Sequence, residues 1–429
     1  MIIHVQPCDS LKGQIAVPSS KSYSIRAFLV AARGGSSRII NPSLCDDARV
    51  SISVAKSLGA RITVSSGNIW KAVAGEKKTK IQAIDVRESG TVLRLLLPLL
   101  PLYTRKAVVR GRGTLRGRPN LPLTRTLRRM GLDIRGQGEK ESIPISFQGG
   151  ELKGGRIKID GSLSSQFISA LLIACPSLDD DSRLCLSGKK VVSRDYIAMT
   201  QQVLRRSGIQ VKQLSARSFF IPGRQKFRGL EKFIVPADYG LAAFTMAAAA
   251  LTRSEVILQG YFDDNFIQAD RAILGFLRKM GVRFTRTARK IGLRGPFELS
   301  GGNFSLKDAP DLVPIMAVLA LFAKGKTRLY DIQHVRAKES DRIGDLKEEL
   351  SKIGAKIVDR SGEMIIYPQR HYRNNMLLDP HHDHRLAMSF CVLGLKLGVR
   401  VKDVGCIDKS YPRFMEDLKI LGVKCKKAK

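Results

Sequence analysis

The chain has 429 residues, which is too long for one ordinary hydrophobic core and predicts two or three domains. With 44% hydrophobic and 26% charged residues it does not resemble a disordered protein, and no apolar run reaches the roughly 18 residues of a membrane helix. A net charge of +35 would attract anionic substrates, nucleic acid or an anionic membrane surface without choosing among them.

The first segment, Met1–Val5, is strand-like and has the pattern of neither a signal peptide nor a transit peptide. The seven cysteines are an odd number without a C-x-x-C pair, which is typical of reduced thiols. We therefore expect a cytoplasmic protein that does not associate with membranes.

A short junction recurs along the chain: the end of a predicted helix, a glycine, and the start of a predicted strand. One copy runs from Arg278 to Phe284. The glycines of the six copies are Gly59, Gly131, Gly208, Gly281, Gly354 and Gly422. Glycine can adopt the left-handed conformation that closes a helix. Six such junctions at a spacing of roughly 70 residues indicate an internal repeat.

Each repeat also contains an apolar helix with small polar or charged residues at its entrance. These entrances are Ser20–Ser22, Ser89–Thr91, Ser164–Gln166, Asp238–Gly240, Pro310–Leu312 and Asp383–Arg385. A β-type stretch such as Thr327–Tyr330 follows, and then a second, amphipathic helix that ends at the glycine. The predicted unit is β-α-β-α-β-β, repeated six times, which indicates an α/β fold with helices packed on sheets.

Several basic residues stand at the predicted helix entrances, where a cation opposes the helix dipole. They are Lys21, Arg118, Lys338, Arg342, Arg385 and Lys409. Capping is the simpler interpretation of each serine or aspartate there, but it does not account for the cations. A bound anion would make them favourable, because backbone N–H groups and side-chain cations would then act together. The pattern predicts a site for phosphate and carboxylate groups.

Four segments at these entrances carry recognisable motifs: Pro18–Arg26, Asp160–Phe167, Arg336–Arg342 and Asp383–Met388. They resemble, in that order, Pro-Gly-Ser-Lys-Ser…Arg, Asp-Gly-Ser-x-Ser-Ser-Gln-Phe, Arg-x-Lys-Glu-Ser/Thr-Asp-Arg and Asp-His-Arg-x-Ala-Met. These are signatures of one family, the 5-enolpyruvylshikimate-3-phosphate (EPSP) synthases. Further matches are Glu88–Arg94, Arg118–Pro119 and Lys409–Pro412. The segments follow the family's order and cover essentially the whole chain.

The resemblance implies two domains, each of three β-α-β-α-β-β repeats in an inside-out α/β barrel, with the active site in the cleft between them. The N-terminal strand would complete the domain built by the last three repeats, so we expect one domain of residues 1–20 and 237–429 and another of residues 21–236. The implied reaction transfers the carboxyvinyl group of phosphoenolpyruvate to the 5-hydroxyl of shikimate 3-phosphate and releases phosphate, by addition and elimination through a tetrahedral intermediate. No cofactor is implied, and a monomer is expected.

Position by position, the resemblance also implies roles for individual residues. Residues expected to be catalytic are Lys21, Asp311, Glu339 and His384. Residues expected to hold shikimate 3-phosphate are Lys21, Ser22, Arg26, Ser164, Ser165, Gln166, Ser193, Tyr196, Asp311 and Lys338. Residues expected to hold phosphoenolpyruvate are Lys21, Gly90, Arg118, Gln166, Arg342, Arg385 and Lys409. Asp311 and Glu339 look like the family's proton-transfer carboxylates, and Lys338 would contact the reacting hydroxyl.

Two positions depart from the family, because Glu88 and His334 stand where it often has asparagine. A carboxylate beside the phosphoenolpyruvate site would be costly unless it paired with a cation such as Arg87 or Arg118, so neither position is assigned a role. The run His381–His384 invites a metal-binding interpretation. Zinc, however, usually takes ligands from separated turns or strands, and no cysteine lies nearby. We expect no metal.

Two alternatives stay open. A UDP-N-acetylglucosamine enolpyruvyl transferase shares the architecture, but that family has Lys-Asn where this chain has Lys21-Ser22, and a cysteine in the loop that here runs from Gly111 to Asn120. A basic RNA-binding protein, or one like an RNA 3′-phosphate cyclase, would suit the charge. The aromatic content is only 6%, however, and aromatic residues are not interleaved with the basic ones. We therefore expect small anionic substrates and no nucleic acid.

Overall fold

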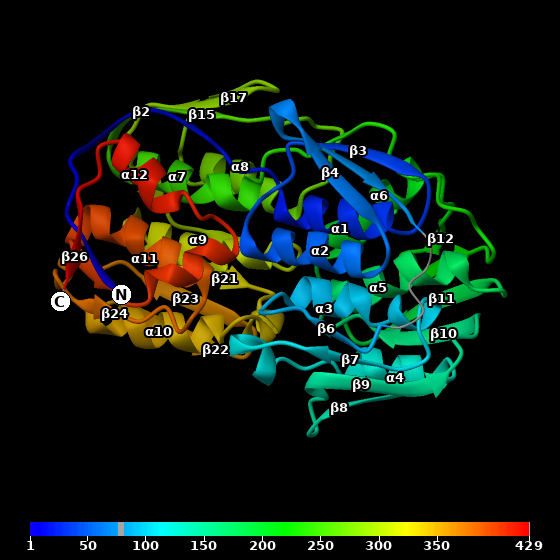
Figure 1. Ribbon diagram of the computed structural model, residues 1–429. Coiled ribbons are helices and arrows are strands. Elements are labelled where there is room, and N and C mark those ends of the chain that lie inside the picture. Colours follow the sequence, from blue (N-terminus) through cyan, green and yellow to red (C-terminus); the bar gives the residue numbers. More distant parts are fainter. Residues whose placement is uncertain (76–80, 429) are drawn as a thin grey trace. The chain divides into compact units, whose positions relative to one another are not determined.

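The computed structural model describes residues 1–75 and 81–428 (Figure 1). The chain divides into two compact units. Unit 1 comprises Met1–Ser19 and Pro236–Lys429, and unit 2 comprises Ser20–Val235. No helix among the described residues combines the length and the apolar composition that a bilayer crossing requires.

Unit 2 contains three of the predicted repeats. Its α-helices are α1 (Lys21–Ala31), α2 (Asp46–Ser57), α3 (Gly90–Leu96), α4 (Leu121–Arg129), α5 (Ser165–Ala174) and α6 (Arg194–Arg206). Its strands are β3 (Ser36–Ile40), β4 (Arg61–Ser65), β5 (Ile69–Val73), β6 (Ala83–Asp85), β7 (Ala107–Arg110), β8 (Leu132–Gln137), β9 (Ser142–Gly150), β10 (Gly155–Asp160), β11 (Ser182–Ser187), β12 (Lys212–Ser215), β13 (Ser218–Ile221) and β14 (Phe233–Ile234).

Unit 1 contains the other three repeats together with the N-terminal strands. Its α-helices are α7 (Tyr239–Leu251), α8 (Ala272–Lys279), α9 (Val313–Leu321), α10 (Arg342–Lys352), α11 (His384–Leu397) and α12 (Phe414–Ile420). Its strands are β1 (Ile2–Val5), β2 (Ser10–Ala16), β15 (Arg253–Gln259), β16 (Phe284–Arg286), β17 (Lys290–Leu293), β18 (Leu299–Ser300), β19 (Asn303–Ser305), β20 (Ala323–Lys324), β21 (Thr327–Tyr330), β22 (Lys356–Arg360), β23 (Glu363–Tyr367), β24 (Leu377–Leu378), β25 (Val399–Val401) and β26 (Cys425–Ala428).

The four-stranded sheets of the described chain share one pattern of pairing. In the order β6-β7-β9-β8, the first pair is parallel and the next two pairs are antiparallel. The order β10-β11-β13-β12 repeats this pattern. The order β19-β21-β23-β22 in unit 1 does so again. Because each of these three sheets is formed by one β-α-β-α-β-β unit, the predicted α/β fold class is confirmed.

Three sheets take one strand from elsewhere in the chain. The strand β2, which precedes α1, pairs in parallel with β15 in unit 1. Conversely, β14, which precedes α7, pairs in parallel with β3 in unit 2. The first strand, β1, lies between β25 and β26 and completes the last sheet of unit 1. The N-terminal segment therefore supplies strands to the sheets of the last three repeats.

The junction glycines have the predicted conformation. All six lie at positive φ, from 84° at Gly208 to 107° at Gly131. Each stands two residues beyond the last residue of the second helix of its repeat and shortly before a strand. At Gly131 the surroundings also exclude a side chain, because a β-carbon would lie 2.4 Å from the carbonyl oxygen of Glu151. A non-glycine residue in this region costs roughly 1–2 kcal/mol.

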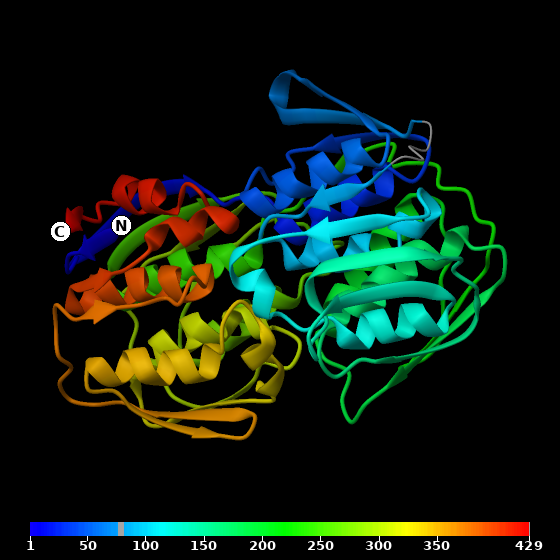
Figure 2. The ribbon, with the colours of Figure 1, turned by 60° about the horizontal axis from the view of Figure 1, so that its bottom comes forward.

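The apolar helices are buried as their sequences predict. Every residue of α7 and of α9 is buried, and α7, α9 and α11 contact one another in unit 1. In unit 2, α1 contacts α3 and α3 contacts α5. Some second helices mainly contact strands, as α4 does with β8 and α10 with β22, and Figure 2 shows α10 (yellow) beside the orange hairpin of β22 and β23. The first helices therefore form the centre of each unit and hold their N-terminal ends in fixed positions.

Candidate active site

Capping is confirmed at five of the six apolar helices. The side chains of Ser20, Ser89, Ser164, Asp238 and Asp383 each accept a hydrogen bond from a backbone N–H of the first turn. The exception is α9, which is preceded by a 3₁₀ turn, Pro310–Leu312, that contains Asp311. The polar residues at the entrances thus have a structural role, and the cations beside them need a separate explanation.

The basic residues predicted at helix entrances fall into two groups. Lys21, Arg342 and Arg385 lie in the first turns of α1, α10 and α11, as expected. The expectation is wrong for Arg118, Lys338 and Lys409, which precede their helices by several residues. Short 3₁₀ turns lie immediately before Arg118 and Lys338, and a third ends at Lys409: Gly113–Gly117, Gln333–Ala337 and Val404–Lys409. Arg118 and Lys409 are nevertheless buried, so both are fixed in place.

In unit 2, Arg26 joins the entrances of α1 and α6. Its guanidinium donates to Oγ1 of Thr200 at 2.8 Å and to the carbonyl oxygens of Ser22 at 3.0 Å and Tyr196 at 3.3 Å. Only 1% of the residue is exposed, and burial lowers the pKa of Arg26 to about 10. All of these acceptors are neutral, so the arginine is a buried cation held without a carboxylate among the residues that the structure describes.

Lys21 joins the entrances of α1 and α2 in a different way. Its Nζ lies 2.9 Å from Oδ2 of Asp47, which is in the first turn of α2. Both side chains are mostly buried. The pair therefore places a cation at the entrance of α1 whose charge is compensated by Asp47. Arg26, one turn further along the helix, donates instead to neutral acceptors.

A second group in unit 2 surrounds the entrances of α3, α4 and α5. The amide of Gln166 donates to Oγ1 of Thr91 at 2.9 Å and accepts from Nη1 of Arg94 at 2.7 Å. Arg94 also donates to the side chain of Asn120 at 3.2 Å. A β-carbon at Gly90 would lie 2.5 Å from Nη1 of Arg118, so glycine allows that guanidinium to approach α3. The structure therefore brings three of the predicted residues, Gly90, Arg118 and Gln166, to one region.

The remaining predicted residues of unit 2 lie at the entrances of α5 and α6. Ser164 caps α5, and Ser165 is the first residue of that helix. Ser193 precedes α6 in a left-handed conformation with φ of 55°, and its side chain makes no capping bond. Tyr196 lies in the first turn of α6, and its carbonyl oxygen accepts from Thr200.

In unit 1, the predicted carboxylates and arginines form one network. Arg342 donates from Nη1 to Asp311 at 2.8 Å, from Nη2 to Glu339 at 3.1 Å and from Nε to Asp383 at 2.7 Å. Arg385 donates to the other oxygen of Asp311 at 3.1 Å and to the carbonyl oxygen of Gly240 at 2.8 Å. The network joins the entrances of α7, α9, α10 and α11.

The charges of the network lower the pKa of Asp311 and raise the pKa of Arg342. Burial alone would raise the pKa of Asp311, but the nearby Arg385, Arg342 and Lys338 hold it well below its usual range. Burial alone would lower the pKa of Arg342, but Asp383, Asp311 and Glu339 raise it well above its usual range. Near neutral pH Asp311 is therefore an anion and Arg342 a cation.

Two histidines are buried next to this network. His384 is the first residue of α11, is 2% exposed, and has Nδ1 3.9 Å from Oδ1 of Asp383. His334 lies in the 3₁₀ turn before Lys338, and burial together with the charge of Lys338 lowers its pKa to about 3. His334 is thus a neutral imidazole near the predicted site.

Several residues outside the predicted set also take part in these groups or support them. Arg94 lies within the Glu88–Arg94 segment, so the motif could have indicated it. His334 was marked only as a departure from the family, and Asn120 gave no signal, because its contacts depend on tertiary structure. Glu349 of α10 supports the turn that leads into α11. The carboxylate of Glu88 packs against Gly113, where a β-carbon would lie 2.3 Å from Oε1.

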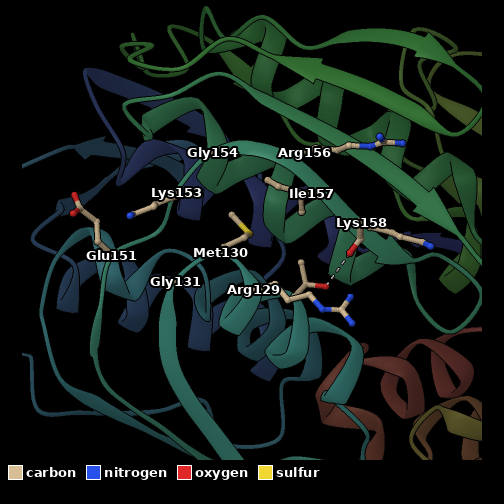
Figure 3. A pocket seen from close by; sticks show the side chains of 10 residues that line it. Arg129, Met130, Gly131, Glu151, Lys153, Gly154, Arg156, Ile157 and Lys158 are labelled. Carbon is tan, nitrogen blue, oxygen red and sulfur yellow. Dashed lines mark hydrogen bonds between the residues drawn. The ribbon is translucent and has the colours of Figure 1, made fainter.

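The candidate metal ligands lie at the turn before α11, and the pocket lies apart from these groups. Within residues 1–75 and 81–428, the three side chains that could share a metal are Glu348, Glu349 and His381, and Lys352 already donates to both oxygens of Glu349. A pocket of about 560 Å³ lies at the C-terminal end of α4, over Met130 and Ile157 (Figure 3). Its described lining includes none of the predicted site residues.

Comparisons with known proteins give one consistent family. The sequence profile of the family described as EPSP synthase (3-phosphoshikimate 1-carboxyvinyltransferase) matches residues 5–418. A protein of Methanosarcina acetivorans named 3-phosphoshikimate 1-carboxyvinyltransferase is 35% identical over 425 residues, which cover 97% of each chain. A protein of the same name from Archaeoglobus fulgidus is 36% identical over 414 residues, or 96% of each chain.

Solved structures agree with the sequence matches. An EPSP synthase from Acinetobacter baumannii is similar with a TM-score of 0.81 and 26% identity, over 99% of this chain and 100% of that one. The enolpyruvyl transferase NikO from Streptomyces tendae has a TM-score of 0.78 and 17% identity, over 99% and 98% of the two chains. At that identity, the likeness to NikO shows the fold alone.

Proposed function

Because the chain belongs to the EPSP synthase (3-phosphoshikimate 1-carboxyvinyltransferase) family of transferases, we propose that it transfers the carboxyvinyl group of phosphoenolpyruvate to the 5-hydroxyl of shikimate 3-phosphate and releases phosphate. This is a reaction of the shikimate pathway, and both substrates are polyanions. The comparisons do not favour a UDP-N-acetylglucosamine enolpyruvyl transferase or an RNA-binding protein.

Shikimate 3-phosphate would be held mainly by unit 2. The supporting observation is Arg26, a buried cation whose hydrogen bonds run to neutral acceptors. A buried charge of this kind is costly, and a phosphate would stabilise it. The residues that would hold this substrate are Lys21, Ser22, Arg26, Ser164, Ser165, Gln166, Ser193 and Tyr196, with Asp311 and Lys338 from unit 1.

Phosphoenolpyruvate would bind the arginines of the unit 1 network in place of their present carboxylate partners. Arg342 is 1% exposed and already forms ion pairs with three carboxylates, and Arg385 forms an ion pair with one of the same three. If the phosphate and carboxylate groups of phosphoenolpyruvate bound these arginines, they would displace Asp311 and Glu339 from them. The carboxylates already neutralise the cations of the network, so a ligand with about three negative charges needs more cations. The residues that would supply them are Lys21, Arg118 and Lys409, with Gly90 and Gln166 beside them.

This exchange would also activate a base. With Arg342, Arg385 and Lys338 beside it, Asp311 has a pKa too low for efficient proton abstraction near neutral pH. If the anionic groups of phosphoenolpyruvate took the arginines, the pKa of Asp311 would rise, so that it could accept the proton of the 5-hydroxyl. Lys338 would orient that hydroxyl. Glu339, His384 and Lys21 would assist protonation of the methylene group and stabilise the charge that develops.

The observation that carries the proposal is the buried network of Asp311, Arg342 and Arg385 in a chain of this family. The test is to mix the purified protein with phosphoenolpyruvate and shikimate 3-phosphate and to measure inorganic phosphate. We expect release only with both substrates present, and none when UDP-N-acetylglucosamine replaces shikimate 3-phosphate. No release with shikimate 3-phosphate, or tight RNA binding with a steep salt dependence in its place, would overturn the proposal.

We further propose that the enzyme works as a monomer in the cytoplasm, without a cofactor. All seven cysteines are free thiols in the structure, in keeping with a reducing compartment. Sedimentation analysis at micromolar concentration should give the 47.4 kDa mass of one chain. Activity should persist after treatment with a chelator.

A further inference from the structure

The turn that leads into α11, residues Asp379–Asp383, has an unusual backbone. His381 and His382 both lie at positive φ, 49° and 58°, although neither is glycine. Residues with a β-carbon adopt this conformation rarely, and two in succession persist only where their surroundings fix them. The turn ends at Asp383, which caps α11 and is followed by His384 and Arg385. Its position therefore sets the position of two proposed site residues.

Glu349 of α10 binds this turn. Its Oε2 accepts from the backbone N–H of Asp379 at 2.8 Å, and its Oε1 lies 3.2 Å from Nε2 of His381. Both oxygens also accept from Nζ of Lys352 at 2.7 Å. The glutamate side chain is 1% exposed, so it is held by these contacts and not by water. Asp379 in turn accepts from the backbone N–H of His381 at 2.9 Å.

Helix α10 thus holds the turn at both of its ends. Arg342 and Glu349 are seven residues apart, which places them two turns apart on the same face of the helix. Arg342 binds the side chain of Asp383 at the end of the turn, and Glu349 binds its start. One rigid helix therefore determines how the strained turn lies.

We propose that Glu349 is a positioning residue for enolpyruvyl transfer: it fixes the turn so that His384 and Arg385 are aligned for phosphoenolpyruvate. This inference rests on the proposed function of Arg385 and His384. Glu349 itself would touch no substrate. Its neighbour Glu348 is exposed on the same helix and offers a matched control.

The first test does not depend on activity. Hydrogen exchange of the intact chain is compared among the natural protein, Glu349→Ala and Glu348→Ala. We expect the amides of Asp379 and His381 to exchange at least about tenfold faster in Glu349→Ala, because the Asp379 N–H loses its acceptor and the turn opens more often. Exchange within α9 and in Glu348→Ala should stay unchanged. Unchanged exchange of the turn in Glu349→Ala, or faster exchange throughout unit 1, would overturn the inference.

The second test separates positioning from general damage. In Glu349→Ala the KM for phosphoenolpyruvate should rise about tenfold or more, while the KM for shikimate 3-phosphate stays within about twofold. Glu349→Gln keeps an acceptor for the Asp379 N–H and should restore most of the loss. If Glu349→Ala does not fold, Glu349→Gln is the test by itself, and we expect it to raise the KM for phosphoenolpyruvate by a smaller factor. Equal rises in both KM values, or none, would contradict the inference.

The two tests fail in different ways. If the natural protein releases no phosphate from the two substrates, the proposed function is wrong, and the exchange measurement still decides whether Glu349 holds the turn. If the natural protein is active and the turn is unaffected in Glu349→Ala, only the inference about Glu349 is wrong.

Discussion

Oδ1 of Asp311 lies 2.8 Å from Nη1 of Arg342, and this bond joins the entrance of α9 to the first residue of α10. The arginine is almost completely buried, whereas 22% of the aspartate side chain is exposed. An anionic ligand could therefore reach the aspartate side of the pair first. The bond explains both why Arg342 is tolerated in the interior and why Asp311 is a weak base before ligand binding.

Substitution of Asp311 by asparagine should remove the proposed base while nearly preserving its shape. We expect kcat to fall by at least about 100-fold, the lower end of what general acid–base catalysis contributes. The KM for phosphoenolpyruvate should not rise, because the arginines lose a competing carboxylate. Steady-state phosphate release measures both quantities. Asp9→Asn, at an exposed position of unit 1, is the control, and an unchanged kcat in Asp311→Asn would rule out this role.

Arg26→Lys should weaken shikimate 3-phosphate selectively. Lysine keeps the charge but cannot reproduce the three hydrogen bonds to Thr200, Ser22 and Tyr196. We expect the KM for shikimate 3-phosphate to rise about tenfold or more, and the KM for phosphoenolpyruvate to change little. The matched control is Arg38→Lys on an exposed face of β3. A larger effect on phosphoenolpyruvate would show that Arg26 is assigned to the wrong substrate.

The repeat and its junctions could be predicted from the sequence because their cause is local. A glycine such as Gly131 closes a helix through its own φ, and an aspartate such as Asp383 caps a helix through the next two residues. The order of helices and strands follows from these signals. Pairing of β2 with β15 could not be derived in this way, since nothing in either segment specifies a partner more than 200 residues away.

The site was predictable to the extent that motifs marked the helix entrances. The resemblance assigns Asp311 to shikimate 3-phosphate and Arg342 to phosphoenolpyruvate, but their direct bond depends on how α9 and α10 pack. The same limit applies to Glu349: its place on the same helix face as Arg342 can be read from a seven-residue spacing, but its contact with Asp379 cannot. The sequence also did not indicate that α4 begins only at Leu121, three residues after Arg118.

His334→Asn should change how stability depends on pH. The pKa of His334 is lowered to about 3 by burial first and by the charge of Lys338 second, whereas the ordinary value is 6.5. The unfolded chain therefore binds a proton below pH 6.5 that the folded chain does not, and the folded state loses stability as pH falls from 6.5 toward 3. At pH 5 this penalty is about 2 kcal/mol, and asparagine would remove it.

Denaturant unfolding at pH 8 and at pH 5 tests this expectation. The free energies of unfolding of the natural protein and of His334→Asn should differ by a constant amount at pH 8 and above. At pH 5 this difference should shift in favour of the variant. His371→Asn serves as the control, because His371 is exposed. The same difference between variant and natural protein at both pH values would contradict a buried neutral imidazole at His334.

Gly90→Ala should displace Arg118 without disrupting the fold. The new β-carbon would lie 2.5 Å from Nη1 and 2.8 Å from Cζ of Arg118, which is the far end of a long side chain and not backbone. The guanidinium would therefore move, and its charge-assisted contact with phosphoenolpyruvate would weaken. Such contacts contribute roughly 1.5–3 kcal/mol, so the KM for phosphoenolpyruvate should rise about tenfold or more. Gly117→Ala, next to Arg118 but with nothing within 4 Å of the added carbon, should leave it unchanged. Equal effects of the two alanines, or a rise confined to shikimate 3-phosphate, would remove Arg118 from the phosphoenolpyruvate site.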